Sequence, residues 1–167
     1  QRLITASETR SGYCEGRIAL EEAKILDGQG NHMASSAKYG VAATTFQNLS
    51  ETASEETCKE LRPMIYLCQA WQKMMMAEAR TSPIMYEQAA ELFEQSKNYT
   101  LTQVTSLLAQ GHSSFCRALE AGTEFEITRD MMLYATAKKY TAAAANFYMQ
   151  AGYSSASEYA KATQRLF

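Results

Sequence analysis

The stretch Tyr39-Gly40-Val41-Ala42-Ala43-Thr44-Thr45-Phe46 recurs twice in the chain with the same spacing of a tyrosine, two alanines and a phenylalanine. The other copies are Tyr86-x-x-Ala89-Ala90-x-x-Phe93 and Tyr140-x-x-Ala143-Ala144-x-x-Phe147, at offsets of 47 and 54 residues. Positions i, i+3, i+4 and i+7 share one face of an α-helix, so each copy predicts a helix with two rings around a patch of methyl groups. We expect the three phenylalanines to be buried at equivalent places.

A second pattern precedes each copy of the first. It consists of an apolar residue, a cysteine, a polar residue and a small residue, and it occurs as Tyr13-Cys14-Glu15-Gly16, Leu67-Cys68-Gln69-Ala70 and Phe115-Cys116-Arg117-Ala118. A small-residue surface lets a neighbouring helix approach closely, so each pair of patterns predicts an antiparallel helical hairpin. We expect these three cysteines to be reduced and buried between the two helices of each hairpin.

The apolar periodicity is helical nearly everywhere, which predicts an all-α chain of about seven helices. Gly122 and Gly152 are placed as helix stops, and Ser82-Pro83 as a helix start. One helical-repeat domain is expected over 1–167, with hairpins at about 5–52, 55–97 and 101–151 and a partial hairpin at about 155–167. The expected helices are 5–26, 32–52, 55–79, 83–97, 101–121, 128–151 and 155–167.

The tyrosine-alanine helices, such as 86–94, resemble the second helix of tetratricopeptide (TPR) repeats. The spacing of the repeat departs from that family's period of about 34 residues, and the Trp-Leu-Gly series of its first helix is missing. Longer hairpins with this pattern are similar to the soluble attachment-protein (SNAP-type) adaptors of vesicle fusion. The resemblance implies antiparallel hairpins stacked as a right-handed TPR-like solenoid, and a role in protein–protein interaction. No binding residue of either family has a matching position in this sequence.

Composition narrows the classes of partner. The chain has 167 residues, 46% of them hydrophobic, and a formal net charge of −2. No window holds the cluster of basic residues that a phosphate-tracking surface needs, so we expect no nucleic acid partner. The uncharged stretches are too polar to span a bilayer, which predicts no membrane insertion. Four cysteines without a C-x-x-C spacing favour a reducing, cytoplasmic compartment.

Two groups of residues could suggest chemistry. His112, Cys116 and Glu120 fall at i, i+4 and i+8, as in a thiol enzyme with a base and an orienting acid. Cys116 occupies the repeated small-residue slot, however, and this favours packing. Acidic residues also gather at Glu120, Glu124, Glu126 and Asp130, but without the glycine placement of a calcium loop. The sequence therefore predicts no catalytic residue, no cofactor and no metal.

The leading hypothesis is a non-enzymatic interaction scaffold or adaptor, forming part of a longer chain, that binds a protein or peptide. The alternatives are a regulatory or recruiting domain of a multidomain enzyme and, less favoured, a thiol enzyme using Cys116. Tyr159, Leu166 and Phe167 are the candidate partner-binding residues, because the last helix has an apolar stripe with no following helix to cover it. That open end could also form a homodimer. Met74-Met75-Met76 and Met131-Met132 are candidates for gap filling or for an adaptable surface.

Overall fold

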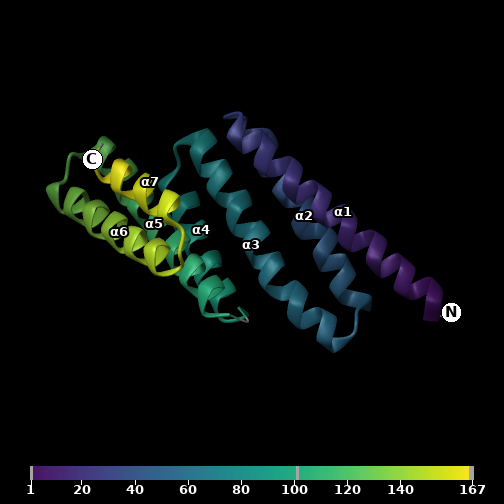
Figure 1. Cartoon of the computed structure of the whole chain (residues 1–167). Helices are drawn as coiled ribbons and strands as arrows, with labels where there is room; N and C mark the ends of the chain where they lie inside the picture. The colour runs from purple at the N-terminus through teal and green to yellow at the C-terminus, as the bar shows by residue number, and fades with distance from the viewer. Residues whose placement is uncertain (1, 101, 166–167) are drawn as a thin grey trace.

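The computed structural model describes residues 2–100 and 102–165, and the side chains from residue 10 onward within these ranges. The described residues form seven α-helices, and the predicted all-α class is confirmed (Figure 1). The helices are α1 (Arg2–Gly28), α2 (His32–Thr52), α3 (Glu55–Arg80), α4 (Pro83–Lys97), α5 (Gln103–Thr128), α6 (Met131–Gln150) and α7 (Ser154–Gln164).

Local chemistry explains most of the breaks between helices. Pro83 is the first residue of α4, where its missing N–H costs no hydrogen bond. Gly152 has φ +83° after α6, the left-handed conformation expected of a helix stop. The prediction for Gly122 is wrong, because α5 continues through it to Thr128 and Gly122 is buried inside the helix. The turn comes instead at Arg129, which takes the left-handed conformation with φ 59°.

Each helix packs against its neighbours in the chain as an antiparallel partner (Figure 1). Glycines allow close approach at two of these contacts. A Cβ atom on Gly16 of α1 would lie 2.5 Å from the ring of Phe46 in α2, and one on Gly111 of α5 would lie 2.6 Å from the ring of Tyr148 in α6. Larger side chains at these positions would force the rings or the helices to shift. In both the first and the third hairpin, a glycine on the first helix therefore makes room for an aromatic ring of the second helix.

The buried stripe is equivalent in the first two hairpins and shifted by one residue in the third. Phe46 and Phe93 are fully buried, as predicted. Phe147 is half-buried, and Tyr148 takes its place in the core at 4% exposure. The third stripe is thus Thr141-x-x-Ala144-Ala145-x-x-Tyr148, with the same i, i+3, i+4, i+7 spacing. A run of four alanines, 142–145, makes both registers equally plausible in the sequence, and packing against α5 selects one.

The cysteine prediction holds for two of its three positions. Cys68 and Cys116 are fully buried, whereas Cys14 is exposed. The physical reason lies in helix order, because α3 and α5 each pack against a helix on both sides, whereas α1 packs mainly against α2. All three cysteines are free thiols, as is Cys58.

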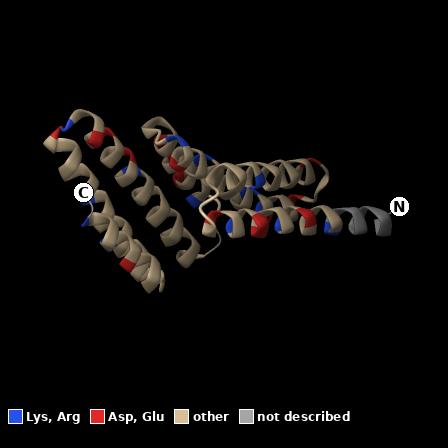
Figure 2. Cartoon of the chain, turned by 90° about the horizontal axis from the view of Figure 1, so that it is seen from above, with Lys and Arg blue, Asp and Glu red and all other residues tan. Residues whose placement is uncertain are grey.

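Charged residues of both signs alternate along the described part of α1 (Figure 2). Glu21 there pairs with Arg17 at 3.5 Å and with Lys24 at 2.9 Å. Among the described residues, no helix is long and apolar enough to cross a membrane.

Candidate functional site

A cavity of about 390 Å³ lies where helices of all the hairpins converge. Its lining comes from the end of α1, the start of α2, and α3, α5, α6 and α7. We call it the aromatic cavity and define it by Asp27, His32, Trp71, Met74, Met75, Glu78, His112, Phe115, Tyr148, Ala156 and Tyr159. Its volume is in the range of small-ligand sites in proteins, roughly 300–1,000 Å³.

Helix geometry explains how one wall of the cavity forms. Trp71, Met74, Met75 and Glu78 follow the i, i+3, i+4, i+7 spacing, so all four project from one face of α3. His112 and Phe115 are likewise neighbours on one face of α5. Each helix also carries part of the hydrophobic core. The cavity is therefore a local gap in an otherwise packed apolar layer.

Burial separates the floor of the cavity from its rim. Met75, Phe115 and Tyr148 are buried, at 3%, 6% and 4% exposure, whereas Tyr159 on α7 is 67% exposed. The rings of Tyr159 and Phe115 nevertheless meet, with centroids 5.7 Å apart and planes inclined by 53°. Tyr159 is thus a rim residue that rests against the wall on one side and is open to water on the other.

A chain of aromatic contacts holds the inner wall. The ring of His112 lies 4.8 Å from Trp71, 5.1 Å from Phe93 and 5.3 Å from Tyr148, measured between centroids. Its Nδ1 shares a 2.9 Å hydrogen bond with the Tyr148 hydroxyl. Trp71 also stacks on Tyr39 at 6.1 Å. These contacts link α2 through α6, so the wall is tied to the core of several hairpins.

Two titratable groups of the cavity are shifted by their surroundings. Burial lowers the pKa of His112 to about 4, which keeps the imidazole neutral near pH 7. Burial also raises the pKa of Glu78, while the hydroxyl of Tyr86 beside it and the nearby His32 act in the opposite direction. At the entrance, His32 Nδ1 lies 3.2 Å from the carboxylate of Asp27. The cavity therefore combines apolar walls with a partly desolvated carboxyl group.

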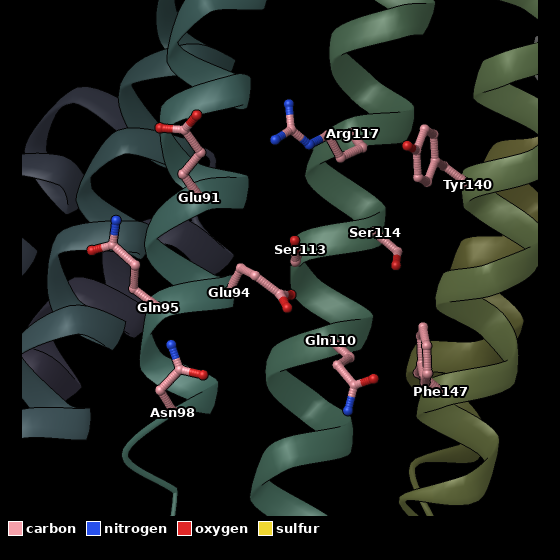
Figure 3. Close-up of a pocket in the computed structure, with 10 residues that line it drawn as sticks. All are labelled: Glu91, Glu94, Gln95, Asn98, Gln110, Ser113, Ser114, Arg117, Tyr140 and Phe147. Atoms are coloured by element: carbon pink, nitrogen blue, oxygen red, sulfur yellow. The ribbon is translucent and has the colours of Figure 1, made fainter.

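A second hollow, which we call the polar groove, has a volume of about 700 Å³ and lies between α4, α5 and α6 (Figure 3). Its lining is mostly polar: Glu91, Glu94, Gln95, Asn98, Gln110, Ser113, Ser114, Arg117, Tyr140 and Phe147. Arg117 pairs there with Glu120 at 3.2 Å and with Glu87 at 3.9 Å. Glu94 pairs with Lys97. Glu94 and Arg117 of the groove are thus paired with neighbouring residues, whereas Glu91 forms no ion pair among the described residues.

The aromatic cavity is the better candidate site, although it is the smaller of the two. Binding sites are usually apolar hollows with a few converging polar groups, and strongly shifted titratable groups tend to gather in them. Trp71, Phe115 and Tyr159 supply the apolar surface of the cavity, and Glu78 and His112 supply the shifted groups. The polar groove has the composition of an ordinary solvated surface.

One of the three predicted partner-binding residues belongs to this cavity. Tyr159 lines its rim. Leu166 and Phe167 lie outside the described residues, so their part in a partner contact, and a homodimer through the C-terminal end, remain predictions. The methionines that were candidates for an adaptable surface also differ in position. Met74 and Met75 line the cavity, whereas Met131 and Met132 are exposed.

The structure does not assemble His112, Cys116 and Glu120 into one reactive group. His112 is hydrogen-bonded to Tyr148, and Glu120 is paired with Arg117. Burial raises the pKa of the Cys116 thiol, which is the reverse of what activates a cysteine nucleophile. Among the described residues, no group of three or more His, Cys, Asp or Glu side chains could hold a metal ion.

Sequence reasoning missed Trp71, Glu78 and Phe115 as site residues. A signal was present, because the only tryptophan of the chain shares a helix face with two methionines and a glutamate. The same spacing describes any helix that packs on a core, so it could not reveal a gap. The gap depends on how α5 and α7 lie against α3.

No protein-family model, curated protein or solved structure matches the chain. The likeness to TPR and vesicle-fusion adaptors is therefore one of sequence pattern, and the function has to be argued from the site.

Proposed function

We propose that this chain is a non-enzymatic interaction module that binds a segment of a partner protein in the aromatic cavity. The observation that supports this most directly is the cavity itself, in which large apolar side chains from α3, α5 and α7 surround an open space. Large aromatic side chains in well-packed pockets supply most of the binding energy in protein interfaces. Right-handed stacking of the hairpins, as in TPR-like solenoids, belongs to the same proposal.

The shifted groups also support binding more than catalysis. A thiol with a raised pKa and a neutral histidine already bonded to a tyrosine offer no activated nucleophile. The methionines at the floor have flexible, polarisable side chains that adapt to the shape of a guest. Exposed Tyr159 can close over such a guest with little loss of packing, because most of its surface is free.

Selection from a random peptide library displayed on phage tests the proposal. The baits are the wild-type chain and two matched variants, Tyr159→Ser at the cavity rim and Tyr140→Ser at the polar groove. We expect the wild type and Tyr140→Ser to enrich one related set of sequences, and Tyr159→Ser to lose it. A set retained by Tyr159→Ser and lost by Tyr140→Ser would place binding in the groove and overturn the assignment. A selection that yields no convergent set would overturn the function itself.

A further inference from the structure

We propose that the aromatic cavity receives the positively charged side chain of a lysine or arginine from the partner segment. This inference rests on the proposed function and adds the chemistry of the residue that anchors the segment. The charges, the aromatic rings and the shape of the aromatic cavity support it.

The fixed charges of the cavity are of one sign. Asp27 and Glu78 are its acids, and among the described residues that line it there is no lysine or arginine. Asp27 has His32 as a partner at 3.2 Å, whereas Glu78 forms no ion pair among the described residues. The Tyr86 hydroxyl beside it is uncharged, and the nearby His32 also favours the charged form of Glu78. A partly buried carboxylate is stabilised by an opposite charge, so a cationic guest would complete the environment of Glu78.

The rings add a second attraction for a cation. A positive charge over the face of an aromatic ring is attracted by the ring's quadrupole, and a ring shielded from water on one side strengthens this contact. Phe115 and Tyr159 meet at an inclination of 53°, and Phe115 is buried on the inner side of this pair. Tyr159 is largely exposed, so much of its ring surface is free to contact a guest.

The shape of the cavity suits a long side chain with an apolar stem. Lysine and arginine carry several methylene groups that pack on apolar surface while the charged head reaches a polar group. Met74 and Met75 provide that apolar surface, and Glu78 lies one turn further along the same face of α3. A space of about 390 Å³ holds one such side chain and excludes a whole helix.

The polar groove gives less reason to expect a cationic guest. Arg117 already supplies a cation beside Glu87 and Glu120, and Lys97 pairs with Glu94. The groove therefore already contains a cation of the chain itself, Arg117, and it serves as an internal control for the test.

The test uses Trp71 as the reporter, because it lines the cavity and is the only tryptophan in the chain. The probe is the peptide acetyl-Gly-Gly-Lys-Gly-Gly-amide, compared with versions that carry arginine or uncharged norleucine in place of lysine. Binding is followed by tryptophan fluorescence and by the NMR shift of the indole N–H. We expect the lysine or arginine peptide to bind the wild type at least about tenfold more tightly than the norleucine peptide.

Matched carboxylate variants assign the effect to Glu78. Glu78→Gln keeps the size of the side chain and removes its charge, and Glu91→Gln does the same in the polar groove. We expect Glu78→Gln to lose at least about tenfold in affinity for the basic peptide and Glu91→Gln to lose none. Circular dichroism checks that both variants are folded. If Glu78→Gln does not fold, Asp27→Asn serves as the second cavity variant, with a smaller loss expected because His32 shares its charge.

The outcomes separate the two proposals. Equal binding of the norleucine and lysine peptides, removed by Tyr159→Ser, would overturn the basic anchor and leave the interaction module standing. Unchanged affinity in folded Glu78→Gln would overturn the anchor as well. If no probe binds, the basic anchor is overturned; if the phage selection also finds no convergent set, the interaction module is overturned with it.

Discussion

The aromatic cavity and the polar groove share helices α5 and α6 but differ in the chemistry of their linings. α5 contributes His112 and Phe115 to the cavity, and Gln110, Ser114 and Arg117 to the groove. At about 100° per residue these two sets point to opposite faces of the helix. The groove is larger, but it already contains a cation, Arg117, which pairs with Glu87 and Glu120. The cavity is smaller, and its carboxyl group, Glu78, forms no ion pair among the described residues. In this chain the volume of a hollow is therefore a poorer guide to function than the presence of a partly buried acid without an ion-pair partner.

The largest expected contrast between the two regions is in stability. Phe93 is fully buried and contacts Trp71 and His112 behind the cavity wall, so Phe93→Ala should cost about 3–5 kcal/mol through lost burial and a new void. Phe147 is half-buried beside the groove, and Phe147→Ala should cost roughly 1 kcal/mol. Urea unfolding of both variants measures the difference. Equal costs would show that the third stripe has the register of Phe147 after all.

The next contrast is in acid sensitivity. The pKa of His112 is about 4 in the folded chain, below its ordinary value of 6.5. Between these two pH values the unfolded chain therefore binds more protons than the folded chain. Above pH 6.5 the contribution of His112 to the free energy of unfolding is fully present, and it is lost as the pH falls towards 4. The loss should reach about 3 kcal/mol.

His112→Gln isolates this effect, because glutamine can still accept a hydrogen bond from Tyr148 but does not titrate. Burial raises the pKa of Glu78 and Glu120, and these acids act in the opposite direction as the pH falls. The comparison is therefore between the two proteins, by urea unfolding at pH 7 and at pH 4.5. The wild type should lose more stability than the variant over this interval. Parallel losses would mean that His112 is protonated in the fold.

A smaller effect is expected in the polar groove. Arg117 is paired with Glu120 and Glu87, but about a third of its side chain is exposed, so water screens both pairs. Arg117→Gln should cost less than about 1 kcal/mol, and the difference should shrink in high salt. Unfolding at two salt concentrations measures this. A cost that persists at high salt would show that the groove is more enclosed than its exposure indicates.

Thiol labelling should distinguish the regions by the order in which their cysteines react, while stability stays unchanged. Cys14 is exposed and should react first with iodoacetamide, followed by Cys58. Burial raises the pKa of Cys68 to about 12 and that of Cys116 also upward, so both should react only when the chain opens. Mass spectrometry of the labelled peptides gives the order. Early labelling of Cys116 would show that the α5 layer behind the cavity is open to water.

The first hairpin shows how far local pattern can be trusted. Tyr39, the alanine pair and Phe46 are buried as their spacing predicts, because only one helical register buries both rings. The third hairpin shows the limit. Its alanine run fits two registers, and the pattern selected Phe147 where packing selects Tyr148. The prediction that Cys14 is buried was wrong for a related reason, since a local pattern does not tell how many neighbours a helix has.

The sequence pointed to only a few residues of the candidate site. Tyr159 was found because it belongs to the apolar stripe of its helix, and Met74 and Met75 because a methionine run can form an adaptable surface. Trp71, Phe115 and Glu78 lie on different helices or in ordinary core positions, and nothing in their local spacing tells a filled core from one with a gap. Contacts between α3, α5 and α7 are separated by dozens of residues, so they are properties of packing.

The sequence by itself determined the all-α class, the seven helices and the antiparallel hairpins, because helical periodicity and helix-stopping residues act over a few neighbouring positions. The tertiary structure alone decided the register of the third stripe, the exposure of Cys14 and the existence of the aromatic cavity. Each of these depends on how closely whole helices approach one another, and that distance is set by the combined fit of side chains from several hairpins.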